Sequence, residues 1–251
     1  MTILQNANIN GSAFPYNPSA TSSVYRYNMS QGRSYNPKKS TSNFLDVSGN
    51  GVTGTAYNIS SQYYPWKCGG MIRLNNLIGY NLNNGLTANL NVGTSNEFTF
   101  IVAWEYSRSN LTNNADIIAG AYMGSTHDWW IGQYLAGSPY KFYRNGVLAA
   151  SLGSAPVAGR RYIAVVGNSY STNAGYFYLF DSAGNSNNNT AISGSQLSTA
   201  GTISLGKYGG WTDDYMPDCY YGDAIYSNTY LSTTNALAIK DQIKYRYGIS
   251  V

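Results

Sequence analysis

Acid–base chemistry in this chain would have to rely on very few carboxylates. The sequence has 251 residues and 11 acidic side chains, of which only Glu97 and Glu105 are glutamates. A retaining glycosidase needs two carboxylates about 5 Å apart. The apolar run between the glutamates predicts one strand, whose length would separate them by roughly 26 Å. We therefore expect no enzymatic activity of this kind.

The single histidine offers the other route to catalysis. Ser125, His127 and Asp128 put a hydroxyl, an imidazole and a carboxylate close together in the sequence. A Ser-His-Asp triad, however, is built from residues distant in sequence and needs an oxyanion hole. We expect His127 to lie on a surface loop and to have no catalytic role.

One acidic cluster has the chemistry of a metal site. Asp213, Asp214 and Asp218 provide three carboxylates within six residues. Ca²⁺ takes six to eight oxygen ligands, and the spacing matches no fixed calcium loop. The cluster is a calcium candidate or simply a polar loop, and we expect no other cofactor.

Aromatic residues could bind sugars by stacking. Trp129 and Trp130 are adjacent in a predicted strand, so one ring should face the core and the other the opposite side. Together with Tyr134, Tyr143 and Trp211, they could form a platform for a glycan. Packing between two sheets, together with contact at an interface, is the explanation of these aromatic residues that we favour.

The excess positive charge lies at the N-terminal end. The net charge is +4, and residues 1–45 contain no acid. Prolines interrupt residues 1–40, which predicts an extended arm preceding a domain over 41–251. The arm residues that could contact a partner are Tyr25, Arg26, Tyr27, Arg33, Tyr35, Lys38 and Lys39. An acidic protein surface fits this arm better than nucleic acid, since the charges are scattered; a solvated tail is the alternative.

Short apolar runs separated by Gly, Asn and Ser predict an antiparallel β-sandwich. Asn145-Gly146 predicts a tight type I′ hairpin, and Asn185–Asn189 is expected to be a polar loop. We expect eleven strands at the following positions: Val52–Tyr57, Gly70–Leu74, Glu97–Glu105, Asp116–Tyr122, Trp129–Tyr134, Tyr140–Arg144, Val147–Ser151, Arg161–Asn168, Tyr176–Asp181, Thr202–Gly206 and Tyr220–Ser227.

One helix should close the chain. Ser232 is placed to cap its N-terminus, and Gly248 stands where a left-handed C-cap is expected. The residues that recur at helical spacing are Ala236, Ile239, Ile243 and Tyr247. These residues should form the buried face of the helix.

Two further features concern the compartment. The first residues lack a secretory pattern, and no apolar stretch is long enough for a membrane span, so we expect synthesis in a cytoplasm. Cys68 and Cys219 are too few for a zinc site, and we expect free thiols, although the two could meet across paired strands.

Several ordered blocks resemble the concanavalin A-like, LamG-type jelly rolls. The run Asp46-Val-Ser-Gly-Asn-Gly is similar to the opening of such domains. Gly69–Asn75, Glu97–Trp104 and Thr202–Gly206 resemble their inner strands. Tyr221–Ser232 is similar to the closing strand that precedes the last helix. The resemblance implies an all-β, two-sheet antiparallel jelly roll with one C-terminal helix. The Glu-x-Asp-x-Glu strand of glycanases with this fold is absent.

The opening block also resembles structural proteins of tailed bacteriophages. This resemblance implies a non-enzymatic virion protein, a capsid decoration or tail accessory, that is anchored by its arm to other subunits and forms homo-oligomers on the particle. The jelly roll would then point outward and contact host-surface polysaccharide. A lectin-like carbohydrate-binding protein outside any virion is the alternative.

Overall fold

The computed structural model describes most of the chain after residue 94 and seven short segments before it. The described residues are 24–28, 33–34, 42–44, 54–57, 66–67, 71–74, 87–93, 95–106, 116–123, 126–133, 137–197, 202–206 and 219–251.

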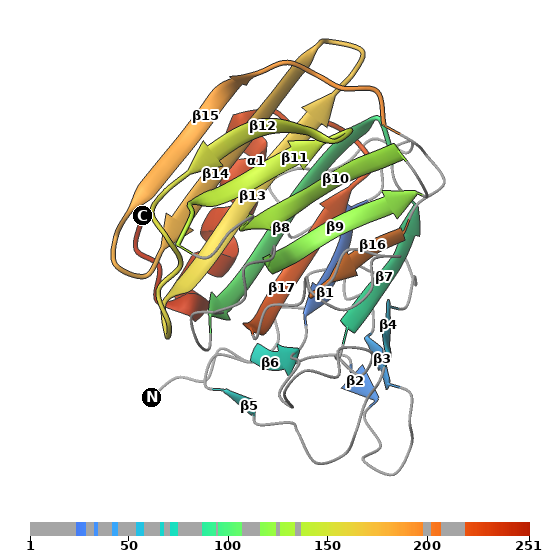
Figure 1. The fold of residues 1–251 in the computed structure, drawn as a ribbon. Helices are drawn as coiled ribbons and strands as arrows, with labels where there is room; N and C mark the ends of the chain where they lie inside the picture. Colours follow the sequence, from blue (N-terminus) through green and yellow to red (C-terminus); the bar gives the residue numbers. More distant parts are fainter. Residues whose placement is uncertain are drawn as a thin grey trace.

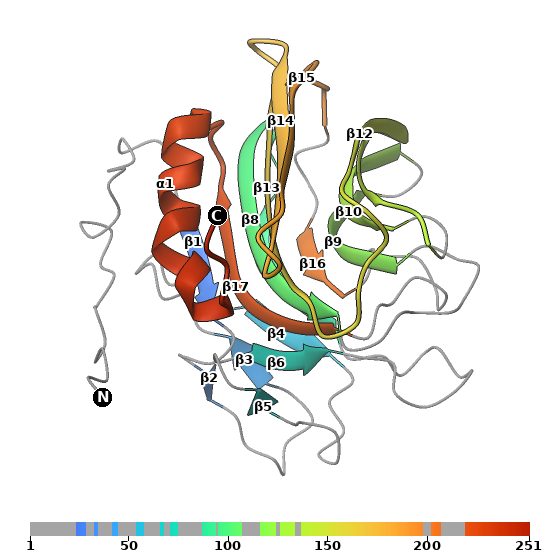
Figure 2. The ribbon, with the colours of Figure 1, turned by 90° about the vertical axis from the view of Figure 1, so that its left-hand side faces the viewer.

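These residues form two antiparallel sheets that pack face to face (Figures 1 and 2). Sheet A runs in the order β15 (Ser186–Ile192), β14 (Ala174–Asp181), β13 (Arg161–Ser169), β8 (Glu97–Tyr106), β17 (Cys219–Ser227), β6 (Met71–Leu74) and β5 (Trp66–Lys67), with β1 (Val24–Asn28) also paired to β17. Sheet B runs in the order β12 (Val147–Leu152), β11 (Tyr140–Arg144), β10 (Thr126–Gln133), β9 (Asp116–Met123), β16 (Thr202–Leu205), β7 (Thr87–Gly93), β4 (Gly54–Tyr57), β3 (Ser42–Phe44) and β2 (Arg33–Ser34). The expected all-β jelly-roll sandwich is confirmed.

Each of the eleven predicted strands corresponds to a strand of the structure. The predicted hairpin is confirmed as well, because Asn145 and Gly146 both have the positive φ angles, 47° and 72°, of a type I′ turn. The prediction of a loop at Asn185–Asn189 is wrong, because Ser186–Ile192 forms β15 at the edge of sheet A. An edge strand keeps much of its surface in water, so a run of asparagines is tolerated there.

The central strands of sheet A are buried on both faces. Every residue of β17 is buried, as is every residue of β8 and β13 after the first. Alternation along β8 directs Phe98 and Trp104 toward sheet B, whereas Ile101 and Ala103 face the other way. Sheet A therefore needs an apolar partner on each side.

The C-terminal helix provides the second partner. Helix α1 (Thr233–Ile243) lies on the face of sheet A that points away from sheet B (Figure 2). Ser232 caps it by accepting a hydrogen bond from the Asn235 amide at 3.3 Å. A 3₁₀ turn (Lys244–Tyr247) follows, and Gly248 ends it with φ 67°. Both predicted caps and the predicted buried face are confirmed.

A bulge in β17 fixes the end of this helical segment. The register between β17 and β8 shifts between Tyr221 and Ala224, which leaves Gly222 and Asp223 opposite one residue. The Tyr247 ring lies against Gly222, and its hydroxyl donates to the buried Asp223 carboxylate at 2.7 Å. Arg246 pairs with the same carboxylate at 3.1 Å. Burial and the nearby Asp223 charge raise the pKa of Tyr247 well above its usual value, so its hydroxyl remains a donor at neutral pH.

The expected N-terminal arm is described at two places. β1 pairs with β17 from Val24↔Ser227 to Asn28↔Asp223, along the edge that β6 leaves open. β2 pairs with β3. The backbones of Tyr25, Arg26, Tyr27 and Arg33 therefore belong to the sheets of the domain itself. Tyr35, Lys38 and Lys39 lie outside the described residues, and the boundary at residue 40 stays a prediction.

Adding a methyl group at Gly222 tests the packing of Tyr247. A Cβ there would lie 2.5 Å from Tyr247 Cε1 and Cζ, so we expect Gly222→Ala to lower the free energy of unfolding by about 2–3 kcal/mol. The measurement is urea unfolding followed by circular dichroism. When Tyr247 is already replaced by alanine, Gly222→Ala should lower the free energy of unfolding by less than about 1 kcal/mol. Equal costs in both backgrounds would contradict this packing.

Candidate functional site

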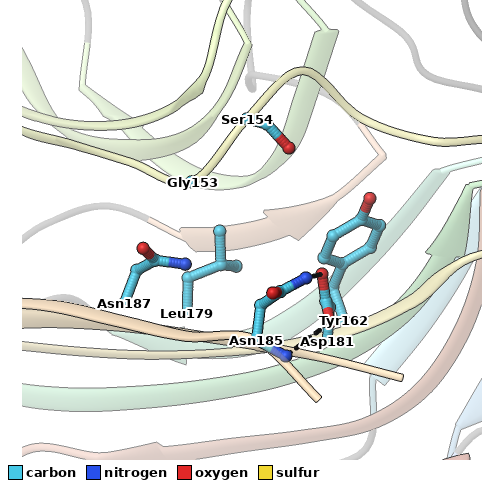
Figure 3. A pocket seen from close by; sticks show the side chains of 7 residues that line it. All are labelled: Gly153, Ser154, Tyr162, Leu179, Asp181, Asn185 and Asn187. Atoms are coloured by element: carbon cyan, nitrogen blue, oxygen red, sulfur yellow. Dashed lines mark hydrogen bonds between the residues drawn. The ribbon is translucent and has the colours of Figure 1, made fainter. Parts of the chain in front are cut away.

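A cleft opens between the two sheets where β12 ends beside β14 and β15. Its volume is about 300 Å³, at the lower end of the range for small-molecule sites. Figure 3 shows the seven residues that line it, namely Gly153, Ser154, Tyr162, Leu179, Asp181, Asn185 and Asn187. Sheet B contributes the first two, and sheet A with its β14–β15 turn contributes the others. The cleft thus lies where the apolar core ends.

Asp181 holds the β14–β15 turn together. Its Oδ1 accepts hydrogen bonds from the backbone amides of Ala183 at 2.9 Å and Asn185 at 3.0 Å. Its Oδ2 accepts from Asn185 Nδ2 at 2.8 Å and pairs with Arg160 at 3.3 Å. Four donors therefore surround a carboxylate that is almost fully buried. Asp181 acts as the fixed floor of the cleft, which it lines together with the amide of Asn185.

Tyr162 provides the aromatic wall. Its ring stacks on Trp104 with a centroid separation of 5.4 Å. Its hydroxyl accepts a hydrogen bond from the Val157 amide at 3.0 Å. Burial raises the pKa of Tyr162, so the phenol stays neutral at physiological pH and can donate a hydrogen bond into the cleft.

Two polar side chains face each other across the cleft without an internal partner in the described structure. Ser154 extends from the sheet B side and Asn187 from β15 (Figure 3). Gly153 lets the chain approach sheet A, because its φ is 75° and a Cβ there would lie 3.1 Å from Leu179 Cδ2. A hydroxyl and an amide are therefore available to a bound molecule from opposite walls.

This set of groups has the chemistry of a binding site for a polar ligand. Hydroxyl, amide and carboxylate groups beside an aromatic ring match a ligand that has many hydroxyls and an apolar ring face. Among the described residues of the lining, Asp181 is the only carboxylate. No group of three or more potential metal ligands occurs within the described ranges.

The described part of the chain contains no helix that is long and apolar enough to cross a membrane.

The sequence-predicted aromatic platform is divided between two faces. Trp129 is buried in the core against Phe98, at a centroid distance of 4.9 Å, which leaves no surface for a sugar. Trp130 lies on the opposite face, stacked on Tyr143 at 4.2 Å, and only 7% of it is exposed. One ring thus faces inward and the other outward, as expected. Tyr134 and Trp211 lie outside the described residues.

Other predicted residues have these positions. Glu97 and Glu105 lie at opposite ends of β8, where Glu105 pairs with Arg161 at 3.0 Å. His127 belongs to β10 and pairs in register with Tyr122, so the expected loop placement is wrong: β10 begins three residues earlier than predicted. Cys219 is buried in β17. The residues that fall outside the description are Cys68, Asp213, Asp214 and Asp218.

The cleft residues were not identified from the sequence. The lining depends on how the turn after Asp181 meets the end of β12, and none of the sequence predictions concerns that contact. An Asp that begins a turn and is followed by an Asn-rich edge strand is the one local signal. It gives no indication that Tyr162 and Ser154 would face it.

Comparison with known proteins supports the fold. No model of a known protein family matches the chain, and no curated protein matches its sequence. A sialidase of Trypanosoma rangeli in complex with sialic acid is similar in structure, with a TM-score of 0.59 and 14% identity over 90% of this chain and 34% of the sialidase chain. The binding domain of botulinum neurotoxin DC in complex with SialylT is also similar in structure. Its TM-score is 0.51 and its sequence identity 10%, over 80% of this chain and 49% of the toxin chain.

These similarities show a shared β-sandwich fold, since the identities are low. The chain spans about a third of the sialidase and half of the toxin domain. Neither comparison indicates a link to a bacteriophage.

Replacing Asp181 tests its role in the cleft. In Asp181→Asn, the new amide would face Arg160 and Asn185 Nδ2 as a donor, so we expect a loss of about 1–3 kcal/mol in the free energy of unfolding. The matched control is Asp241→Asn, because Asp241 is about half exposed and its ion pairs with Lys240 and Lys244 should contribute less than about 1 kcal/mol. Denaturant unfolding of both variants would show the difference, and equal losses would contradict the assignment.

Proposed function

We propose that this domain binds carbohydrate in the cleft between the ends of its two sheets. The observation that carries the proposal is the pair of opposed polar groups, Ser154 and Asn187, above a floor made by Asp181 and beside the Tyr162 ring. A sugar residue combines hydroxyls on its rim with an apolar ring face, and this lining complements both. The fold supports the proposal, since two proteins of similar fold have structures with sialic acid or SialylT.

The cleft favours a neutral sugar. The nearest charged lining group is the Asp181 carboxylate, and an acidic sugar would be repelled by it. Arg160 already pairs with that carboxylate and therefore does not reverse the local preference. The volume of about 300 Å³ fits one sugar residue, such as the end of a longer chain.

We propose that the domain binds its ligand without transforming it. A glycosidase of the common type needs two carboxylates within about 10 Å. In the described structure the cleft has one, and four donors already hold it. Glu97 begins β8 at the other end of sheet A. Glu105 lies two strands from Asp181 at the same end, but on the opposite face of the sheet, where it pairs with Arg161.

A role in a bacteriophage particle is a second proposal, and it rests on the resemblance of the opening block Asp46–Gly51. In this proposal the chain is a capsid decoration or tail accessory protein, and its N-terminal residues contact neighbouring subunits. β1 lies on sheet A beside β17, so the part left for such contacts precedes Val24 or follows Asn28. The carbohydrate cleft would then face the host-surface polysaccharide.

Glycan binding can be tested with a matched pair of asparagines. Asn187 lines the cleft, whereas its neighbour Asn188 is exposed on the opposite side of β15. We expect the chain to retain neutral glycans on an array, and Asn187→Ala to weaken the best binder about tenfold in calorimetry, because it removes hydrogen bonds. Asn188→Ala should bind as the unchanged protein does. No retained glycan, or equal losses in both variants, would contradict the proposal.

The particle proposal needs a truncation that spares the sheet. Deleting residues 1–40 would remove β1 and β2, so the informative deletion ends at residue 20. We expect full-length protein to co-sediment with purified particles of the source phage. The truncated chain, with an unchanged circular dichroism spectrum, should co-sediment less. Full-length protein that never co-sediments would overturn the proposal, whatever the result with glycans.

A further inference from the structure

Arg144 is a buried cation inside the sandwich. It ends β11 on the same face as the core residues Tyr140 and Phe142, and only 5% of it is exposed. Its guanidinium lies 5.6 Å from the centre of the Phe142 ring. Burying a charge in such a place is costly unless an opposite charge accompanies it.

The other buried charges of the described structure have such partners. Ion pairs join Glu105 to Arg161, Asp181 to Arg160, Asp223 to Arg246 and Lys240 to Asp241. Arg144 forms no ion pair with any described residue. Its Nη1 donates to Asn168 Oδ1 and its Nη2 to the Ser193 carbonyl, and both acceptors are neutral.

Two donors at this place remain unused. Within the described part of the chain, Arg144 Nε has no hydrogen-bond acceptor, and neither has the indole Nε1 of Trp129, which is fully buried. The two residues are partners in the β10–β11 register, so their side chains lie next to each other on the inner face. Buried donors without acceptors are rare in folded proteins.

The surroundings hold the guanidinium in a fixed position. Asn168 donates to the carbonyls of Asn96 at 2.7 Å and Ser195 at 2.9 Å, which locks its own orientation. Gly175 leaves room for the charge, because a Cβ there would lie 3.2 Å from Arg144 Nη1. The neighbouring residues therefore leave space for the guanidinium and hold its acceptor Asn168 in place.

We propose that Arg144 and Trp129 form a binding site for one small anion, with a carboxylate as the preferred ligand. Arg144 Nε and Trp129 Nε1 would donate to its oxygens, and its charge would compensate the guanidinium. Burial lowers the pKa of Arg144 to about 10, so the side chain remains charged at neutral pH. A water molecule would satisfy the donors but leave the charge without a partner.

The site is separate from the proposed carbohydrate cleft. Gly175, beside Arg144, and Asp181 lie six residues apart on β14, or roughly 20 Å. The two ligand classes also differ, since the cleft offers a carboxylate and this site a guanidinium. The anion proposal can therefore be tested independently of the carbohydrate proposal.

The test is a titration of the ¹⁵N-labelled full-length chain with sodium acetate, with the ionic strength held constant by sodium fluoride. We expect the Nε–H resonance of Arg144 and the Nε1–H resonance of Trp129 to shift together and to saturate.

The variant Trp129→Phe keeps an aromatic ring against Phe98 and Phe100, and the loss of its indole signal identifies the resonance of Trp129. It should weaken acetate binding about five- to tenfold, since one charge-assisted hydrogen bond is lost.

Thermal unfolding provides the second measurement. Acetate should raise the midpoint of the unchanged protein, as expected for a ligand of the native state, but not that of Arg144→Gln. Arg161→Gln, which removes a partly exposed arginine paired with Glu105, should keep the acetate effect.

One further ligand, N-acetylneuraminic acid, identifies the source of the carboxylate. Stronger binding of N-acetylneuraminic acid than of acetate would indicate the acid group of a sugar, and equal binding a small carboxylate. Acetate that leaves both resonances unmoved up to 100 mM, or an Arg144→Gln variant that retains the full acetate effect, would overturn the proposal. The resonances of the unchanged protein decide the question even where Arg144→Gln does not fold.

Discussion

Sheet A is apolar on both faces, and the rest of the described structure depends on covering it. A strand such as β17, buried at every residue, cannot stand at the surface of a sandwich. Sheet B covers one face and helix α1 the other, so the helix is a required third layer rather than an appendage. The bulge at Gly222 and the Tyr247–Asp223 hydrogen bond fix where that layer ends.

The same arrangement determines where a ligand can bind. Between the sheets, large aromatic side chains fill the middle of the sandwich, and the described cleft opens where strands end. At one end, the turn after Asp181 and the segment after β12 diverge and leave a polar cleft. Near the other end of β14, Gly175 makes space for Arg144. Polar groups therefore gather at the two ends of an apolar core, where water or a ligand can satisfy them.

The sequence predicted elements well where local chemistry determines them. Ser232 and Gly248 define the helix, and Asn145-Gly146 determines the hairpin, because each of these signals acts within a few residues. β15 was missed because its asparagines depend on pairing with β14 rather than on strand propensity. The cleft was missed for a related reason. Ser154 follows a strand of sheet B, whereas Tyr162 and Asn187 belong to two strands of sheet A, and the packing of the two sheets brings them together.

The low charge of the chain makes each buried charge informative. Only 10% of the residues are charged, so an arginine in the core is not a chance result of a highly charged composition. The alternation Tyr140, Phe142, Arg144 already directs this arginine inward, although nothing in the sequence tells which groups surround it. A buried charge that has no opposite charge beside it carries a desolvation cost. The described structure pairs its other buried charges with opposite ones and leaves space for Arg144 at Gly175. The proposed anion would give the fold a reason to keep this charge.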